Sequence, residues 1–462
     1  MPPSRTEGPG LSRSLARVAT HTTVRLAVVG AVAAAASYVV FGVVTRPPLH
    51  QFFDLRVYRG AVTWWLHGRP LYSFATVPNG YGFTYPPFAA ILMVPLAWLT
   101  SRTSTVLTVA ASVAVIVTIT ARLVAPVARR HGRTPWFAAA LAVPVVLTLE
   151  PIRDTLGYGQ LNMLLFALVM ADLLALRRGW AWAGAGIGLA TAIKLTPGLF
   201  IVFLFLIGKR RSASVATGTF LGATLLAFVV DGAASWHFWT NALWDTSRVG
   251  RLEKPSNQSV MGVLAHVADP GQPNRAMWAV LAGAVLILGM WRAARVYRRG
   301  DDLVAFTVVG LTACLVSPIS WTHHLYWIVP AVVVLVDVAA GTPLHATALG
   351  WSRRRRRMVA VGAAVSALTV VLAFIVGFPW LFHQPTGALT AILGTSSYAV
   401  LMVALVVLLP VRRTVPLDER HEDTVALRHT VDDTVTLRVV TAAGPGVGRS
   451  PGPPRPGGWS PR

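Results

Sequence analysis

The chain is short of acidic residues and nearly lacks cysteine. Among its 462 residues only 18 are Asp or Glu, and charged residues of both signs make up 13%. The single cysteine, Cys314, excludes an intramolecular disulfide framework and a cysteine metal site. With 54% hydrophobic residues and a mean hydropathy of +0.58, this scarcity of charge excludes an ordinary soluble globule and predicts an integral membrane protein.

The basic residues are concentrated in short segments between apolar stretches. Clusters stand at 129–133, 177–178, 209–211, 292–299, 353–357 and 412–413, and they contribute to a net charge of +23. Cytoplasmic loops of membrane proteins carry such an excess of Lys and Arg. We therefore interpret the clusters as cytoplasmic loops that contact anionic lipid headgroups, and we expect no nucleic-acid partner.

Apolar stretches that approach the length needed to cross a bilayer recur from residue 25 to residue 410. We expect an all-α polytopic membrane protein with about 12 transmembrane helices and both termini in the cytoplasm. The N-terminal segment (1–24) is cytoplasmic, the transmembrane domain covers 25–410, and the tail (411–462) is disordered in the cytoplasm. Within the domain, residues 180–208 are predicted to form two short crossing helices, broken near Thr196 and Pro197.

Residues 86–100 are apolar but do not fit this topology as a crossing, because they would then place the Arg129 cluster outside. We expect a re-entrant or interfacial helix that begins at Pro86 and Pro87, since proline is tolerated in a first helical turn. Such a segment at membrane depth requires protein or a water-filled cavity beside it, so it is a candidate cavity wall. The alternative is an ordinary short span.

Polar motifs from six separate segments lie on the extracytoplasmic side of this topology. They are Asp54, Tyr85-Pro86-Pro87, Gly159-Gln160-Leu161-Asn162, Lys194-Leu195-Thr196-Pro197, Asn257-Gln258-Ser259 and Ser317-Pro318-Ile319-Ser320-Trp321-Thr322-His323-His324. Helix ends and loops that gather polar residues on one face are typical of an active site or a binding cavity.

Asp54 directly follows the first span and is the preferred general base, because a carboxylate can deprotonate a hydroxyl nucleophile. It can alternatively cap a short helix, and Asp231 and Asp245 are rival carboxylates. Lys194 stands in a proline-broken turn, where its point charge suits a phosphate. The alternative is a lysine that extends to the membrane interface.

His323 and His324 are adjacent, so on a helix their side chains diverge by about 100° and do not easily hold one metal ion. One of them can bind or protonate a phosphate oxygen. Gln160 and Asn162 can bind sugar hydroxyls or cap backbone groups. A base on one side and phosphate-binding groups on the other suit glycosyl transfer from a lipid phosphate, and we expect no metal and no cofactor.

The motifs together resemble glycosyltransferase family 87, the polyprenol-phosphate-mannose-dependent α-(1→2)-mannosyltransferases of actinobacteria. The resemblance runs from about residue 50 to residue 330. It rests on Asp54-Leu55-Arg56-Val57-Tyr58, Gly68-Arg69-Pro70-Leu71-Tyr72, Phe83-Thr84-Tyr85-Pro86-Pro87 and the four later motifs that begin at Gly159, Lys194, Asn257 and Ser317.

The resemblance implies a type C glycosyltransferase fold in the plasma membrane, with the active site on the extracytoplasmic side. It implies a β-mannosyl phosphoryl polyprenol donor, an inverting displacement, and a phosphatidylinositol mannoside or lipomannan-type glycan as acceptor. Asp54 matches the catalytic base, and a histidine of the pair, preferably His323, matches a donor-phosphate contact that we extend to Lys194 and His324. We expect substrate contacts from Arg56, Tyr58, Tyr85, Gln160, Asn162, Asn257, Gln258 and Trp321.

Two other functions remain open from the sequence. A lipid-linked sugar flippase or secondary transporter also uses broken helices and an intramembrane lysine. A type C transferase for another sugar, such as arabinofuranose, is the nearer alternative.

Overall fold

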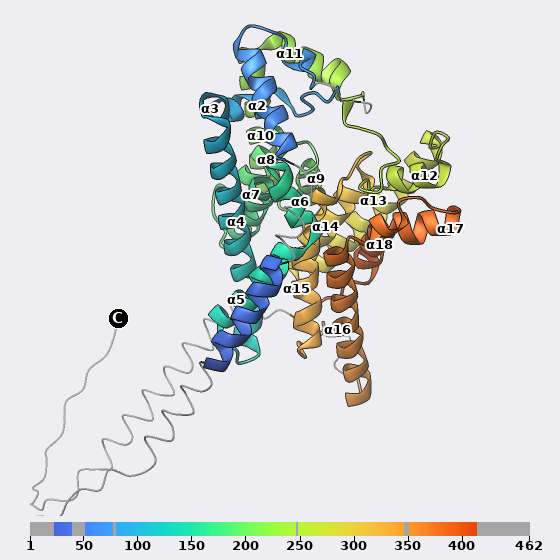
Figure 1. Cartoon of the computed structure of the whole chain (residues 1–462). Helices are drawn as coiled ribbons and strands as arrows, with labels where there is room; N and C mark the ends of the chain where they lie inside the picture. Colours follow the sequence, from blue (N-terminus) through green and yellow to red (C-terminus); the bar gives the residue numbers. More distant parts are fainter. Residues whose placement is uncertain (1–22, 39–50, 77–79, 246–247, 346–350, 414–462) are drawn as a thin grey trace, which may run out of the picture. The chain divides into compact units, whose positions relative to one another are not determined.

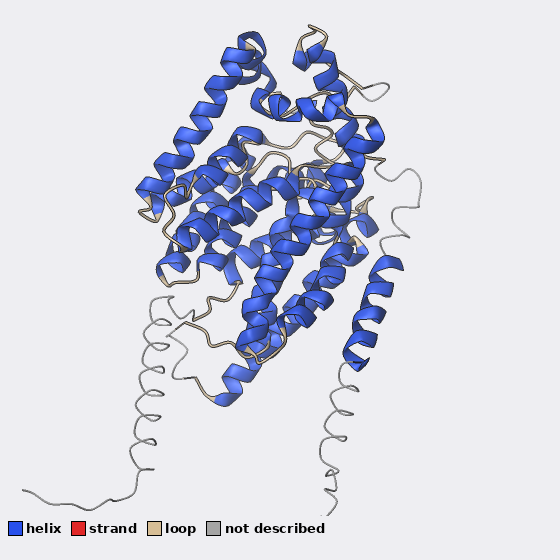
Figure 2. Ribbon diagram, turned by 90° about the vertical axis from the view of Figure 1, so that its left-hand side faces the viewer, coloured by secondary structure: helices blue, strands red, loops and turns tan. Residues whose placement is uncertain are grey.

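A computed structural model describes residues 23–38, 51–76, 80–245, 248–345 and 351–413. Figure 2 shows these residues as helices joined by loops, without a strand among them. The predicted all-α class is therefore confirmed for the described part of the chain. The predicted N-terminal segment and the tail beyond residue 413 lie almost wholly outside it.

Figure 1 labels the helices that follow an N-terminal helix over Thr23–Tyr38. The first group is α2 (Phe53–Leu66), α3 (Pro87–Trp98), α4 (Ser101–Arg130), α5 (Pro135–Thr148), α6 (Glu150–Tyr158), α7 (Asn162–Arg177), α8 (Ala185–Ile193), α9 (Gly198–Leu206), α10 (Arg210–Val230) and α11 (Gly232–His237). The second group is α12 (Val260–Ala268), α13 (Arg275–Arg298), α14 (Asp302–Val316), α15 (Ile328–Ala339), α16 (Arg353–Val376), α17 (Ala388–Thr390) and α18 (Ser397–Leu408). Shorter turns are η1 (Leu71–Ser73), η2 (Phe238–Ala242), η4 (Thr322–Trp327), η6 (Phe378–Phe382) and η7 (Ala391–Thr395).

Several of these helices are long and apolar enough to cross a membrane. By length and composition the described residues contain 5 such helices, or up to 7 spans if each of two bent pairs counts as one. The bent pairs are α5 with α6, which meet at 68°, and the helical segment 388–395 with α18, which meet at 67°. The chain is therefore a multi-pass membrane protein, while the larger predicted number of crossings stays a prediction.

The predicted break in residues 180–208 is present. Helices α8 and α9 have 9 residues each and are separated by the segment from Lys194 to Pro197. A helix of this length rises about 14 Å, which is less than half of a hydrocarbon core about 30 Å thick. Neither helix reaches that length alone, and Lys194 stands between two half-length helices. The two crossings expected within residues 180–208 stay a prediction.

Helix α3 begins where the two prolines predict. Pro87 is its first residue, Pro86 precedes it in extended conformation, and the helix has 12 residues. Its rise of about 18 Å is too short for the alternative of an ordinary span. It packs against α2, α8 and α10. A re-entrant or interfacial position for α3 stays a prediction.

A buried ion-pair cluster, consisting of Arg130, Asp301, Asp337 and Arg412, joins three helix ends and the segment after α18. Arg412 donates to Asp301 at 2.7 Å and to Asp337 at 3.0 Å, and Arg130 also pairs with Asp337. Both carboxylates are fully buried. These bonds hold together the end of α4, the start of α14, the end of α15 and the segment after α18. Residues 411–413 therefore belong to the packed body and not to the tail in which we had placed them.

Candidate active site

A cavity of about 890 Å³ is lined by α2, α6, the α8–α9 break and the segment that leads into η4. It gathers most of the predicted site residues from distant parts of the chain. Those that line it are Asp54, Arg56, Tyr58, Tyr85, Gln160, Lys194, Trp321, His323 and His324. Its size suits a sugar-bearing ligand, because small-molecule sites commonly enclose about 300–1,000 Å³.

Asp54 lies in the first turn of α2, where the positive end of the helix dipole favours a carboxylate. The start of this helix is docked on the end of α6. The amide of Phe52 donates to the carbonyl of Gly157 at 2.9 Å. Gly159 has φ +69°, and a Cβ there would lie 2.8 Å from the Cβ of Leu55, so only glycine permits this approach. The Gly159-Gln160 motif thus sets the position of Asp54.

Gln160 connects Asp54 to the rest of the cavity. Its Nε2 donates to Asp54 Oδ2 at 2.5 Å and lies 3.3 Å from Nε2 of His323. Its Oε1 faces the hydroxyls of Tyr58 at 2.8 Å and Tyr85 at 3.0 Å. Burial raises the pKa of both phenols more than any other cause. Both hydroxyls therefore stay protonated and can donate hydrogen bonds. The two tyrosines therefore fix the amide with its NH₂ group toward Asp54.

Lys194 and His324 form a hydrogen-bonded pair on the cavity wall. Lys194 Nζ lies 2.8 Å from His324 Nε2 and 5.4 Å from the centre of the Tyr85 ring. The backbone N–H of Trp321 donates to His324 Nδ1 at 3.2 Å, so neutral His324 carries its proton on Nε2. With this tautomer the 2.8 Å contact is a hydrogen bond from His324 Nε2–H to Lys194, which accepts as a neutral amine. An anion placed against the pair favours protonated Lys194, and it can then accept a hydrogen bond from Lys194 and from His324 Nε2–H. The pair is therefore suited to a phosphate.

Three predicted substrate contacts lie behind the cavity wall instead of on it. Asn162 donates to the carbonyl of His323 at 2.8 Å, and Asn257 Oδ1 accepts from the backbone N–H of Ser320 at 3.0 Å. Gln258 donates to the carbonyl of Thr395 at 2.7 Å. Their amides are buried on backbone groups, so we correct their role from substrate contact to structural support. Asn162 and Asn257 support the histidine segment, and Gln258 supports the start of α18 through Thr395 and Ala399. The sequence predicted polar residues at these helix ends but not the direction of their side chains.

The cavity also contains Glu150, to which the sequence gave no role, and Asp154, which the sequence allowed to pair with an arginine there. Glu150, on α6, accepts hydrogen bonds from Trp380 at 2.6 Å and Tyr398 at 2.5 Å. Asp154, one turn later, accepts from Thr322 at 2.5 Å. The sequence could have predicted these residues, because Glu150 and the Arg153-Asp154 pair are charged residues in an otherwise apolar segment.

The two rival carboxylates differ in position. Asp231 caps α11 and accepts from Trp65 Nε1 at 2.8 Å, and it does not line the cavity. Asp245 lines the cavity from an exposed position in the loop that follows η2. Among the described residues no group of three or more His, Cys, Asp and Glu side chains is placed to hold a metal ion.

Comparison with known proteins identifies the family. The model of glycosyltransferase family 87 matches residues 83–318, a region that contributes much of the cavity wall. The chain belongs to glycosyltransferase family 87. It is therefore an enzyme, a membrane glycosyltransferase, and Asp54 lies before the matched region.

Mycobacterial relatives are similar to this family 87 chain over most of its length. It is 36% identical over 338 residues (69% of this chain, 74% of the relative) to the polyprenol-phosphate-mannose-dependent alpha-(1-2)-phosphatidylinositol mannoside mannosyltransferase of Mycobacterium tuberculosis. The protein of the same name from Mycolicibacterium smegmatis is 34% identical over 340 residues, with coverage of 69% and 74%. A phosphatidylinositol pentamannoside mannosyltransferase of Mycobacterium tuberculosis is 32% identical over 347 residues (73% and 74%). No solved structure was found to match the chain.

Proposed function

We propose that this enzyme transfers mannose from polyprenyl-phosphate-mannose to a hydroxyl of a phosphatidylinositol mannoside, with inversion and an α-(1→2) linkage. The names of the relatives support the donor, the acceptor class and the linkage. The observation that carries the mechanism is the cavity itself. It brings Asp54 and the Lys194–His324 pair into one cavity, where Gln160 bonds to Asp54 and lies close to His323.

Asp54 acts as the general base. The acceptor hydroxyl gives its proton to the carboxylate while its oxygen forms a bond to the anomeric carbon of the donor mannose. The bond from that carbon to the phosphate oxygen breaks with its electron pair, and polyprenyl phosphate leaves. Attack from the face opposite the leaving group turns a β-mannosyl donor into an α-mannoside. Gln160 holds the carboxylate in position through the bond to Oδ2.

Lys194 and His324 bind the phosphate, which gains negative charge as the bond breaks. Both groups donate hydrogen bonds, and Lys194 adds a positive charge where it is most needed. His323, which the sequence analysis preferred as the phosphate contact, faces Gln160 instead. We therefore assign His324 to the phosphate and His323 to the network that orients Asp54. Arg56, Tyr85 and Trp321 remain the proposed substrate contacts of the wall.

The cavity faces away from the cytoplasm in this proposal, within a type C fold that has about 12 crossings and both termini inside. The basic ends of α4 and α7, together with the Arg353–Arg357 cluster, then face the cytoplasm. Labelling of Asp54→Cys and Arg354→Cys in a Cys314→Ser background with an impermeant maleimide on intact cells tests this. We expect labelling at position 54 only, and outside labelling at position 354 overturns the topology.

Mannosyl transfer by the purified chain in liposomes tests the function. We expect a mannosylated phosphatidylinositol mannoside from polyprenyl-phosphate-mannose and none from GDP-mannose, with the α-(1→2) linkage found by methylation analysis. Product from an arabinofuranosyl lipid phosphate in place of the mannosyl donor assigns another sugar. Movement of labelled donor across the bilayer without product indicates a transporter and contradicts the proposal.

A further inference from the structure

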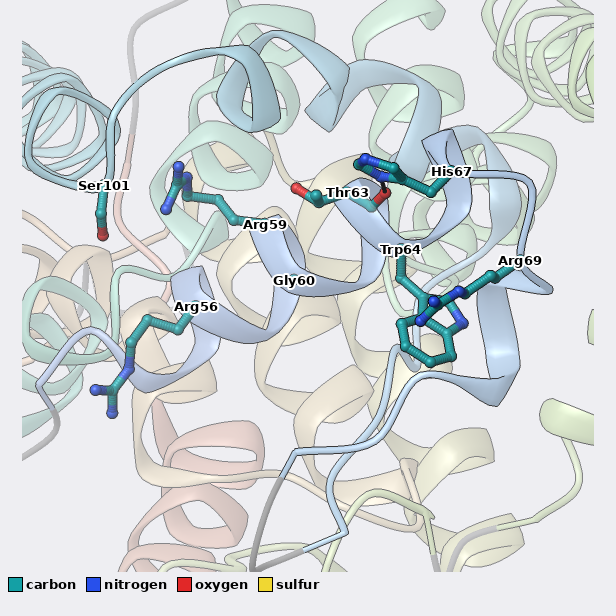
Figure 3. A pocket seen from close by; sticks show the side chains of 8 residues that line it. All are labelled: Arg56, Arg59, Gly60, Thr63, Trp64, His67, Arg69 and Ser101. Atoms are coloured by element: carbon teal, nitrogen blue, oxygen red, sulfur yellow. Dashed lines mark hydrogen bonds between the residues drawn. The ribbon is translucent and has the colours of Figure 1, made fainter.

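An open groove of about 560 Å³ runs along α2. We call it the α2 groove, and it is lined by Arg56, Arg59, Thr63, Trp64, His67 and Arg69, with Ser101 at one end. Figure 3 shows the side chains of Arg56 and Arg59 extending toward the end that holds Ser101, and Arg69 against Trp64 at the other end. The groove is strongly basic and has no place in the chemistry derived above, apart from Arg56.

The α2 groove and the cavity lie on opposite faces of one helix. At about 100° per residue, Asp54 and Tyr58 share one face of α2, whereas Arg56, Thr63 and His67 fall on the other. Arg56 begins on the groove face, and its long side chain lines both the cavity and the groove. From Arg56 to His67 the groove follows about 16 Å of helix, which is the scale of a lipid headgroup that carries sugars.

The cations of the groove are not neutralised by acids. No ion pair among the described residues includes Arg56, Arg59 or Arg69. Arg59 donates to the carbonyls of Leu96 at 3.0 Å and Leu99 at 2.6 Å, and so holds the end of α3. Arg69 lies 4.0 Å from the ring centre of Trp64, and the exposed Arg56 side chain points to solvent. The groove therefore presents at least two guanidinium groups to a ligand.

We propose that the α2 groove binds the phosphodiester of the acceptor glycolipid while the acceptor's terminal mannose enters the cavity. Guanidinium groups bind phosphate oxygens in bidentate geometry, and Thr63 adds a hydroxyl beside them. A phosphatidylinositol mannoside has its phosphate at the lipid end and its acceptor hydroxyl several sugars away. A separate phosphate site next to the catalytic cavity suits such a ligand. This inference rests on the proposed function and names the acceptor subsite.

The same chemistry can come from two sources. A bulk anionic phospholipid presents a phosphodiester like that of the acceptor, but it carries no mannose for the cavity. If the groove binds the acceptor, a substitution in the groove changes the KM for phosphate-bearing acceptors alone. If the groove binds bulk lipid, the substitution changes the KM for every acceptor, and the change depends on the lipid composition of the membrane. The test therefore varies acceptor and membrane separately.

The test compares Arg69→Gln and the Arg56→Gln/Arg69→Gln double variant with wild type in phosphatidylcholine liposomes. We expect Arg69→Gln to raise the KM for a phosphatidylinositol mannoside by about tenfold, since a hydrogen bond to a charged group is lost. The double variant raises it further. For octyl α-mannoside, which lacks a phosphate, the KM of Arg69→Gln changes by less than about twofold. Arg102→Gln removes an exposed arginine outside the groove and is the matched control, with unchanged KM for both acceptors.

Three results overturn the inference. The first is an equal rise in KM for both acceptors, and the second is an Arg102→Gln variant as impaired as Arg69→Gln. The third is a defect that appears only when phosphatidylglycerol is present, together with stimulation of wild type by that lipid for both acceptors. The last result assigns the groove to bulk lipid. In each case transfer to octyl α-mannoside by wild type keeps the proposed function intact, whereas no transfer to either acceptor refutes the function itself.

Discussion

The ion-pair cluster and the cavity both contain carboxylates, but the hydrogen-bond partners of those carboxylates differ. In the cluster, Asp301 and Asp337 are met by the guanidinium of Arg412 in direct ion pairs. In the cavity, Asp54 accepts from the amide of Gln160, and Glu150 accepts from a phenol and an indole. Opposite charges in contact stabilise one arrangement of helices. Asp54, which meets a neutral amide instead of a guanidinium, stays available as a base.

We therefore expect the residues of the cluster to contribute to stability and the residues of the cavity to contribute to activity. If this division is correct, substitutions in the two regions separate cleanly in a pair of measurements, the free energy of unfolding and the rate of transfer per folded molecule.

Arg412→Met should cause the largest loss of stability. It leaves Asp301 and Asp337 buried without their shared partner, and breaking such a pair lowers the free energy of unfolding by about 3–5 kcal/mol. Unfolding of the purified chain in detergent measures the loss. Transfer per folded molecule should remain near wild type, and adding Asp301→Asn should restore part of the stability. A stable but inactive Arg412→Met chain contradicts the division.

Gln160→Met should reduce the rate without a comparable loss of stability. It removes the hydrogen bond to Asp54, and loss of a bond to a charged group costs about 1.5–3 kcal/mol, which corresponds to about 10- to 100-fold in kcat. Steady-state kinetics with both substrates measure the effect, with KM values nearly unchanged. If KM rises while kcat is retained, Gln160 contacts substrate directly, as the sequence first suggested, and does not position Asp54.

Tyr85→Phe should have a smaller effect of the same kind. One of the two phenol contacts to Gln160 Oε1 is lost, while that of Tyr58 remains. We expect kcat to fall by about 2- to 10-fold, the usual range for one neutral hydrogen bond. Tyr58→Phe is the matched variant, and the double variant should approach Gln160→Met. A double variant with wild-type kcat shows that the amide needs no such support.

His266 is a buried polar residue outside both regions, and it should give the smallest effect. Burial lowers its pKa, and its ring bonds to Ser396 at 2.7 Å and to the carbonyl of Lys254 at 2.9 Å. Because the folded protein prefers the neutral ring, its contribution to stability is complete above the unfolded pKa of about 6.5 and declines below it. The slope is at most about 1.4 kcal/mol per pH unit.

Unfolding temperatures between pH 7.5 and pH 5.5 measure this effect. Wild type should lose more stability on acidification than His266→Gln, whose amide can still donate to the Lys254 carbonyl. Equal losses in the two chains contradict a role for His266 in the pH dependence.

The sequence predicted the membrane class and most residues of the cavity wall, but not which of the predicted residues contact the cavity and which support its wall. Asp54 and Lys194 were identified because ionisable residues at the ends of apolar segments are scarce, and such residues in a bilayer usually have a function. Which way a side chain points depends on contacts with distant segments. Asn162 reaches the carbonyl of His323, and Gln258 reaches that of Thr395, so neither faces the cavity.

Long-range partners also explain what was missed. Glu150 is held by Trp380 and Tyr398, and Arg412 by acids more than 70 positions earlier, at Asp301 and Asp337. Hydropathy predicts two crossings in residues 180–208 because it counts apolar residues. It does not register that a break from Lys194 to Pro197 leaves two helices of 9 residues.

The most direct test of the division is the transfer rate of Asp54→Asn beside its unfolding temperature and donor binding. The amide keeps the size of the side chain but cannot accept the proton of the acceptor hydroxyl. We expect kcat to fall by about 10²-fold or more, the scale of general-base loss, while donor affinity and unfolding temperature stay near wild type. Asp245→Asn, another carboxylate of the cavity wall, should retain its rate. Near-normal transfer by Asp54→Asn would contradict the assignment of the base.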